Sequence, residues 1–302
     1  MMIRIKSLFR AVFFCSLLIL GTAFFVSGNA STTPGFKGYN PKPLTEESKA
    51  SLEKINDYTA TFIKKELFGK KMGKVETIEF KFRKPNDVYM HWIGDTNKGQ
   101  EALYRKGVNG NRVKAHKGGL LNVINVNSEP EGKLVMEGQH HRIVDAGIGP
   151  TSHLVYRGMQ KGIERNEVTF VNHGTVKDNG RELIKIEAIY PEICEGVTHT
   201  VAKGETLWDL ARKYNQDMYV ILHNNKRIKS PTDIKAGQKV LVPYHYCHRA
   251  VTWTDAKTKL LMKLEIYDWN NTLYEFYEFK DVKINVGLTD MDFDPKNPKY
   301  KF

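Results

Sequence analysis

The spacing of apolar residues changes several times along the chain, and each change marks an expected element. From residue 45 to about residue 56, apolar side chains recur at helical spacing, and Thr45 at the start is a suitable N-cap. A second helix is expected from Pro150 to Gln160. From residue 57 the period falls to two, which is typical of half-buried strands. The apolar residues of 75–83 alternate and would share one strand face: Ile78, Phe80 and Phe82.

Turn residues join several alternating segments into expected β-hairpins. The clearest hairpin connects residues 168–177 to 182–190 through Asn179-Gly180, because Asn-Gly suits the two positive φ angles of a type I′ turn. Two more hairpins are expected within residues 103–116 and 259–286. The predicted fold class is α+β, with an antiparallel curved sheet or open half-barrel over one or two helices.

A different order of elements is expected between residues 197 and 243. A short strand ends near Ala202, and Thr206 then caps a helix whose apolar residues recur at helical spacing. A second short helix is expected at 218–224 and a second strand at 239–242. The order β-α-α-β within about 45 residues predicts a small unit with a minimal core of its own.

The first thirty residues have the layout of a secretory signal peptide. An apolar run at 11–26 is followed by the small residues Gly28 and Ala30, which suit cleavage after Ala30. The alternative is an uncleaved anchor, but the run is shorter than the roughly 20 residues that a spanning helix needs. We therefore expect an exported bacterial protein of the periplasm or cell envelope, with no transmembrane segment after signal removal. The basic residues before the run are Arg4, Lys6 and Arg10.

The net charge changes the expected partners only slightly. The formal charge is +12, and residues 1–30 hold three cations and no acid, so the remainder carries 12 − 3 = +9. An exported basic protein is attracted to anionic lipids and wall polymers. Nucleic acid is the other usual partner of such charge, but export argues against it, so no nucleic-acid binding is expected.

Three stretches of the β-α-α-β unit resemble a LysM domain: residues 199–214 (HTVAKGETLWDLARKY), 221–225 (ILHNN) and 234–243 (IKAGQKVLVP). The resemblance implies binding of N-acetylglucosamine-containing glycan, as in peptidoglycan, in a shallow groove between two loops. The implied glycan-binding residues are Gly204, Glu205, Thr206, Leu207, Asn225, Ile228, Ser230 and Ile234. Structural roles remain open for some of them, because Thr206 is an N-cap in either case and Ile228 and Ile234 could belong to the core.

The surrounding β-rich region resembles the bacterial domain of unknown function family 1571 in four stretches: residues 84–90 (KPNDVYM), 99–104 (GQEALY), 140–147 (HHRIVDAG) and 281–288 (DVKINVGL). Its layout is similar to the lipoprotein carriers LolA and LolB, which implies an open antiparallel barrel over helices with an apolar cavity. That step is a fold analogy and does not establish function.

The two resemblances together imply an inserted module. The expected organisation is a signal peptide (1–30), a flexible lead-in (31–44), a β-rich LolA-like domain (45–196 and 247–302) and a LysM domain (197–246). Cys194 and Cys247 flank the insertion, and antiparallel stems would bring them close, so a disulfide is expected. The alternative is two buried free cysteines.

No enzyme, metal or cofactor is expected. His140, His141 and Asp145 form one polar group and His245 and His248 flank Cys247, but neither group has the His-Glu-x-x-His spacing of a zinc site. We see no serine nucleophile motif and no glycine-rich phosphate loop.

Three functions remain possible at this stage. The first is a non-catalytic envelope protein that binds peptidoglycan through LysM, with a β-rich domain for an apolar ligand or partner. The second is a periplasmic lipid or lipoprotein carrier. The third is a peptidoglycan hydrolase or hydrolase activator. An apolar concave sheet face would favour the second, and a wet face with a convergent acid–base pair would favour the third.

Overall fold

The computed structural model describes residues 36–119 and 125–302. The expected signal peptide, its cleavage site and the first part of the lead-in lie outside these residues. Within the described part, no helix is long and apolar enough to cross a membrane.

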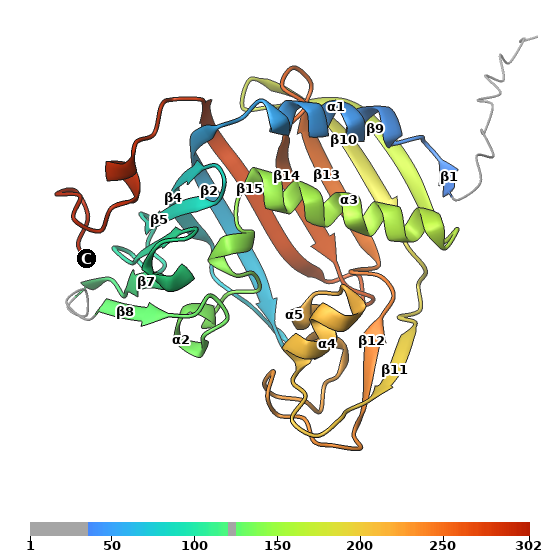
Figure 1. Ribbon diagram of the computed structural model, residues 1–302. Coiled ribbons are helices and arrows are strands. Elements are labelled where there is room, and N and C mark those ends of the chain that lie inside the picture. The colour runs from blue at the N-terminus through green and yellow to red at the C-terminus, as the bar shows by residue number, and fades with distance from the viewer. Residues whose placement is uncertain (1–35, 120–124) are drawn as a thin grey trace, which may run out of the picture. The chain divides into compact units, whose positions relative to one another are not determined.

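A large curved antiparallel sheet dominates the described residues (Figure 1). Its two end strands, β1 and β8, do not pair with each other, so the sheet stays open. Every pairing is antiparallel except that of β1 with β9. In spatial order the strands are β1 (Phe36–Gly38), β9 (Val168–Asp178), β10 (Arg181–Ile189), β13 (Arg249–Asp255), β14 (Leu261–Tyr267), β15 (Leu273–Ile284), β2 (Asp57–Phe68), β4 (Glu76–Arg83), β5 (Asp87–Trp92), β6 (Glu101–Arg105), β7 (Val113–His116) and β8 (Asn125–Ser128), with β3 (Lys71–Met72) paired to β2.

Two helices, α1 (Lys42–Glu53) and α3 (Ile148–Glu164), lie across one face of this sheet (Figure 1). A third, α2 (Lys133–Met136), is a single turn. Gly147 precedes α3 with a φ of 106°, and a Cβ there would stand 2.5 Å from the Tyr58 hydroxyl. That hydroxyl accepts from Ile148 N at 2.8 Å, so the entry to α3 is fixed against β2.

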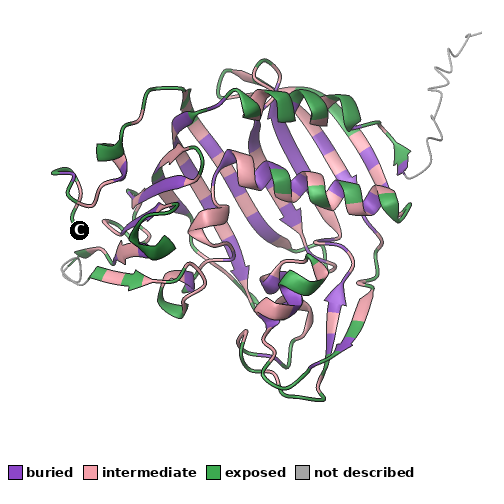
Figure 2. Ribbon diagram, viewed as in Figure 1, coloured by how far each residue is buried: buried purple, intermediate pink, exposed green. Residues whose placement is uncertain are grey.

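The sheet face under the helices is apolar because the pairing register places the apolar residues of adjacent strands opposite one another on this face. Register places Phe62 of β2 opposite Phe279 of β15 on one side and Ile78 of β4 on the other. The rings of Phe62 and Phe279 stack with centroids 4.8 Å apart, and Phe80 is fully buried beside them. Figure 2 shows the buried residues alternating along the strands. Each fully buried side chain of this size contributes about 1.5–3 kcal/mol.

The opposite face of β5 and β6 is covered by the C-terminal segment. Phe293, in the short helical turn η4 (Asp290–Phe293), is fully buried against Tyr89 and Leu103. The ring of Tyr300 stacks on Tyr89 with centroids 3.9 Å apart. The segment therefore forms a small second core on this side of the sheet.

Residues 196–243 form the β-α-α-β arrangement that the sequence predicts (Figure 1). The strands β11 (Gly196–Thr200) and β12 (Lys239–Pro243) pair antiparallel, and α4 (Leu207–Tyr214) and α5 (Met218–Asn224) lie between them in sequence. Thr206 caps α4 in a reciprocal capping box with Asp209. The unit has its own core, which includes Leu207, Leu210, Met218, Ile221 and Val240.

The prediction of a flexible lead-in over residues 31–44 is wrong for the part of it that the structure describes. Phe36 is buried with its ring edge-on to Phe170, and β1 pairs with β9. The helix begins at Lys42 and not behind Thr45, because Pro43 fits the first turn, where no backbone donor is needed. Thr45 instead donates its hydroxyl to Pro41 O at 2.9 Å.

The expected disulfide is also wrong, because both cysteines are free thiols. The stem pairs Tyr190 with His248 and Glu195 with Tyr244, so Cys247 and Cys194 lie at opposite ends of an irregular stretch. Cys194 donates to Asn224 Oδ1 at 3.4 Å, whereas Cys247 is buried in the core of the large sheet. Burial raises the pKa of the Cys194 thiol to about 11 and raises that of Cys247 further.

Candidate functional site

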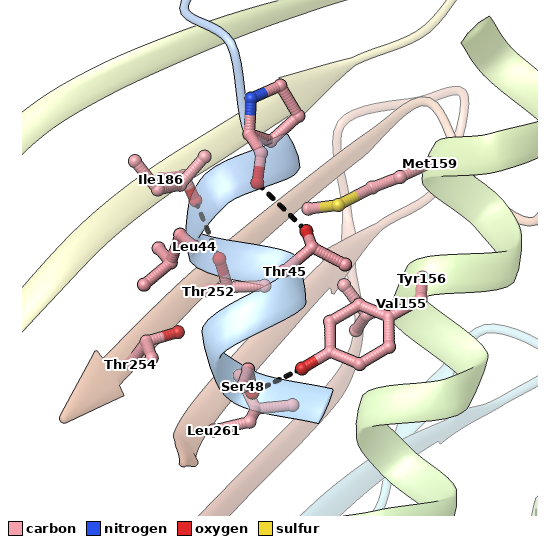
Figure 3. A pocket seen from close by; sticks show the side chains of 11 residues that line it. Leu44, Thr45, Ser48, Val155, Tyr156, Met159, Ile186, Thr252, Thr254 and Leu261 are labelled. Carbon is pink, nitrogen blue, oxygen red and sulfur yellow. Dashed lines mark hydrogen bonds between the residues drawn. The ribbon is translucent and has the colours of Figure 1, made fainter. Parts of the chain in front are cut away.

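A narrow apolar slot lies where α1 and α3 meet the sheet (Figure 3). Leu44 of α1, Val155 and Met159 of α3, and Ile186 and Leu261 of the sheet line it. Several hydroxyls at its edge are engaged in hydrogen bonds; Thr252, for example, donates to Ile186 O at 3.2 Å. The cavity measures about 20 Å³, which suits about one water molecule. The slot is therefore nearly closed in this structure.

Helix α1 forms one wall of the slot and is held mainly by polar contacts. Ser48 is its one fully buried residue and accepts a hydrogen bond from the Tyr156 hydroxyl of α3 (Figure 3). Glu47 pairs with Lys259 at 3.2 Å, and Lys84 donates to the carbonyl of Glu53 at 2.7 Å. Because only Leu44 and Leu52 of α1 pack partly on the core, little apolar burial holds the helix down.

The structure brings the two predicted glycan-binding loops together. The backbone N–H of Leu207 donates to Pro231 O at 2.8 Å, which ties the first loop to the second. Gly204 is exposed with a φ of 83° and no neighbour within 4 Å of a Cβ built there. Ser230 and Ile234 are half-buried. These positions and the loop backbone are what the loops offer to a ligand.

The other predicted glycan-binding residues have structural tasks here. Leu207 and Ile228 are buried in the core of the unit, so their side chains face away from solvent. The carboxylate of Glu205 accepts from Ala202 N at 2.7 Å and lies 2.8 Å from His199 Nε2. Asn225 donates to Leu241 O and accepts from Leu241 N, which joins the end of α5 to β12.

A buried charge cluster joins this unit to the large sheet, and sequence reasoning missed most of it. Lys64 and Glu66 continue the inward-facing positions of β2, and Glu275 lies directly opposite Glu66 on β15. Polar residues at positions that the alternation assigns to the core are the signal that could have found them. The members are Lys64, Glu66, Glu76, His140, His141, Asp217, Tyr246, Glu275 and Tyr277.

Glu275 is the centre of the buried charge cluster and is fully inaccessible. Its Oε1 lies 2.8 Å from His140 Nδ1 and 3.2 Å from His141 Nε2, and the Tyr246 hydroxyl donates to it at 2.8 Å. Burial opposes ionisation, but the two imidazoles outweigh it and hold the pKa of Glu275 well below its usual range. Glu66, the other buried carboxylate at this point of the sheet, is paired with the ammonium group of Lys64 at 2.7 Å.

His141 links the sheet to the β-α-α-β unit. Its Nδ1 lies 3.6 Å from the carboxylate of Asp217, which caps α5, while its Nε2 faces Glu275. Burial disfavours the charged imidazole, but the carboxylates of Glu275, Asp217 and Glu66 outweigh it and raise the pKa of His141 to about 10. The imidazole is therefore charged at neutral pH.

A groove of about 480 Å³ opens above His141, with α3 on one side and α4 on the other. We call it the seam groove. Trp208 and Arg212 line it from α4, and Leu154 and Arg157 line it from α3. Its volume lies in the range of small-molecule sites, about 300–1,000 Å³.

The histidines that the sequence analysis weighed as metal ligands have other partners. Asp145 pairs with Arg142 at 2.6 Å and does not join His140 and His141. His245 Nε2 lies 2.7 Å from Glu167, and His248 Nδ1 lies 3.2 Å from Pro191 O. Across residues 36–119 and 125–302, no three His, Cys, Asp or Glu side chains converge as metal ligands would.

An open antiparallel sheet under two helices, with a small two-helix unit beside it, defines a mixed α+β class. A model of the family described as "Protein of unknown function (DUF1571)" matches residues 55–218 and 196–302. The chain belongs to this family.

Other likenesses are partial or distant. An endolysin of Bacillus phage B103 is 34% identical over 88 residues, which cover 29% of this chain and 31% of that protein, so the chain spans about a third of this curated relative. MucB is 10% identical, with 86% of this chain and 64% of that chain covered and a TM-score of 0.42. The lipoprotein LppX of Mycobacterium tuberculosis is 11% identical, with 84% and 100% covered and a TM-score of 0.41. A LolA superfamily protein of Nitrosomonas europaea is 8% identical, with 85% and 98% covered and a TM-score of 0.30. Likenesses this distant leave the function to be argued from the sites themselves.

Proposed function

We propose that the protein is a non-catalytic carrier of the cell envelope, which binds the acyl chain of a lipid or lipoprotein between α1, α3 and the large sheet. The observation that carries this proposal is the apolar sheet face under the two helices, together with the small apolar slot between the helices and the sheet. A continuous apolar surface that only movable helices cover is what an acyl chain requires, because its binding energy comes from removing apolar area from water.

Binding of this kind requires α1 to move. A cavity of about 20 Å³ is far smaller than the roughly 300 Å³ of the smallest usual ligand sites. Lifting α1 would break the Ser48–Tyr156 hydrogen bond and uncover Val155, Met159 and Ile186. The polar attachment of α1 keeps the cost of this movement low. The carrier is therefore closed when empty and opens around its ligand.

A displacement assay with a fluorescent fatty acid tests the proposal. The protein is expected to take up the probe, and unlabelled acyl chains of increasing length should displace it with increasing affinity, by about 0.8 kcal/mol for each added CH₂. Filling the slot with Thr252→Phe should weaken uptake. Uptake that is absent, or that does not depend on chain length, would contradict the proposal.

The Tyr156→Phe variant tests the movement of α1. Losing the hydrogen bond to Ser48 removes about 1 kcal/mol from the closed state, so the open population and the rate of probe uptake should rise about fivefold. Tyr267→Phe is the matched control, because its hydroxyl bonds to Glu265 at 2.8 Å outside the slot. Equal uptake rates for the two variants would show that this contact does not control entry.

A second function is supported by the β-α-α-β unit. We propose that it is a LysM module that binds N-acetylglucosamine-containing peptidoglycan glycan and so keeps the carrier at the wall. The support is its motif, its element order and the contact between its two loops at Leu207 and Pro231. On this proposal the ligand contacts loop backbone near Gly204, Ser230 and Ile234, and the buried Leu207 and Ile228 support the loops from beneath.

Retention on insoluble peptidoglycan tests the glycan proposal. Gly204→Asp would place a charged side chain at the mouth of the loops and should abolish retention. Gly237→Asp is a matched control, since Gly237 has a φ of 82°, also has no neighbour within 4 Å, and lies outside both loops. Both variants carry the same strain and charge, so equal retention would contradict the assignment of the loops.

The buried charge cluster does not support the hydrolase alternative. Glu275 is fully buried with its oxygens engaged, and the raised pKa of His141 makes it a poor base at neutral pH. We propose that the buried charge cluster attaches the β-α-α-β unit to the large sheet. We also propose that the protein acts in the periplasm or envelope without catalysis.

A further inference from the structure

The seam groove is lined by a combination of groups that neither proposed site contains. Trp208 of α4 offers the flat apolar face of an indole, and Leu154 of α3 adds to the apolar lining. Polar groups stand among them, including Thr151 and Gln216. An apolar platform among convergent hydrogen-bonding groups is the usual construction of a site for a small polar molecule with one apolar face.

The charges of the groove are unequally compensated. Arg142 pairs with Glu131 at 2.8 Å and with Asp145 at 2.6 Å, and Arg212 pairs with Glu131 at 3.2 Å. Arg157 differs, because among the residues with described positions it has no carboxylate partner. Its one hydrogen bond goes to Asn215 Oδ1 at 3.1 Å. The guanidinium is exposed and keeps donors for a further partner.

The floor of the groove is a charge-paired imidazole. His141 lines the groove together with Asp217, whose carboxylate lies 3.6 Å from its Nδ1, while its Nε2 lies 3.2 Å from the buried Glu275. These two carboxylates use the ring nitrogens and offset the charge of the ring. The attraction of the groove for an anionic ligand therefore comes from Arg157 and not from its floor.

From these features we propose that the seam groove binds a carboxylated sugar, with the sugar ring against Trp208 and the carboxylate on Arg157. A guanidinium matches a carboxylate in geometry and can bind it bidentately. The ring of a pyranose presents C–H groups on one face, which suit the indole, and hydroxyls at its edge for the polar lining. The site goes beyond the proposed function, since the acyl slot and the glycan loops supply none of these groups.

Such a ligand would contact both parts of the chain at once. Trp208 belongs to the β-α-α-β unit and Arg157 to the helix that covers the large sheet. Arg157 and Lys161 already reach across to Asn215 at the end of α4, and a bound sugar would add to this connection. Occupancy should therefore strengthen the attachment of the unit.

Calorimetric titration of the full chain with three sugars tests the proposal. The probes are an N-acetylmuramic-acid-containing disaccharide, a trigalacturonate and the neutral disaccharide N,N′-diacetylchitobiose. The first two carry carboxylates from different sources, wall glycan and uronate polymer, and the third carries none. We expect at least one carboxylated sugar to bind at least tenfold more tightly than the neutral one, and the preference between the two identifies the source.

Variants locate the binding. Arg157→Gln should weaken binding of the carboxylated sugar about tenfold, as expected for loss of a charged hydrogen bond. Trp208→Leu should weaken it as well, and Trp208→Phe should restore part of the affinity. Arg181→Gln, outside the groove, is the matched control for charge. In Gly204→Asp, whose glycan loops should no longer bind, the preference for the carboxylated sugar over the neutral one should remain.

Three results would overturn the proposal. The first is neutral and carboxylated sugars binding with equal affinity. The second is Arg157→Gln binding as the unmodified chain does. The third is loss of carboxylated-sugar binding in Gly204→Asp alone, because the ligand would then lie in the glycan loops. Failure of the acyl-chain assay has no bearing on these outcomes, so the two proposals can fail separately.

Discussion

Replacing Glu275 by Gln should expose how strongly the buried charge cluster holds the fold. The amide keeps the size of the side chain but removes its charge from a fully buried position. The two imidazoles and the Tyr246 hydroxyl, which lie 2.8, 3.2 and 2.8 Å from the carboxylate, then share one neutral amide oxygen in place of a charged acceptor. His141 in particular loses its nearest carboxylate and is left with that of Asp217, 3.6 Å from its Nδ1, as the nearest one.

The expected loss of folding stability in Glu275→Gln follows from the cost of leaving a buried charge without its partner, about 3–5 kcal/mol. A domain of ordinary stability has about 5–15 kcal/mol in total, so the variant should fold but with much of its margin lost. With a urea dependence of about 3 kcal/mol per M, the midpoint of unfolding should fall by about 1–1.7 M.

The pH dependence gives a second measure of the same contact. The pKa of His141 is raised to about 10 in the folded chain, against about 6.5 when unfolded. A raised folded pKa contributes stability that is complete below pH 6.5 and is lost as the pH rises toward 10. In Glu275→Gln the pKa of His141 falls back toward its ordinary value. The stability difference between the two proteins should therefore shrink between pH 6.5 and pH 10.

Urea unfolding followed by circular dichroism measures both effects. Glu278→Gln is the control, because Glu278 lies on the same strand with its side chain on the other face and pairs with Lys280 at 3.4 Å. Loss of such a pair near the surface costs at most about 1 kcal/mol. If the two variants lost equal stability, or if the difference between Glu275→Gln and the unmodified chain stayed constant with pH, the reasoning about the cluster would be refuted.

Three further predictions concern other parts of the fold. Phe293→Ala should cost about 3–5 kcal/mol in urea unfolding, because this ring fills the core under the C-terminal segment, whereas Met291→Ala, half exposed, should cost little; equal costs would contradict the second core. Gly147→Ala should destabilise the chain through its φ of 106° and its contact with Tyr58, while Gly149→Ala, with open space and a helical position, should be neutral or stabilising by up to about 1 kcal/mol. In mass-spectrometric alkylation, Cys194 should react as the pH rises toward 11 while Cys247 stays protected until unfolding, and a disulfide-linked peptide would show the free-thiol assignment to be wrong.

Local sequence patterns predicted the hairpins well because their determinants are local. Asn179 and Gly180 both have positive φ, 47° and 77°, as a type I′ turn needs, and β9 pairs with β10 on either side. The apolar set Ile78, Phe80 and Phe82 does share one face. Helix α3 is longer than expected, because Gly147 and the Tyr58 hydroxyl fix its start before Pro150.

The parts that sequence reasoning missed depend on distant contacts. Strand β13 is buried on both faces, so it lacks the polar alternation that marks a strand. Strand β1 exists because Phe36 finds Phe170, far along the chain. The buried charge cluster needs β2 beside β15, and Lys64 and Glu66 look like surface residues until that register is known. The thiols stay apart because the stem between them is irregular, a detail that spacing does not reveal.

Native mass spectrometry of the protein, purified from bacterial envelopes without detergent, tests the carrier proposal most directly. The account predicts one added mass per chain that fragments to an acyl-containing lipid or lipopeptide, with lower occupancy in Thr252→Phe. A bare mass for the unmodified chain, even after incubation with envelope lipids, would contradict it.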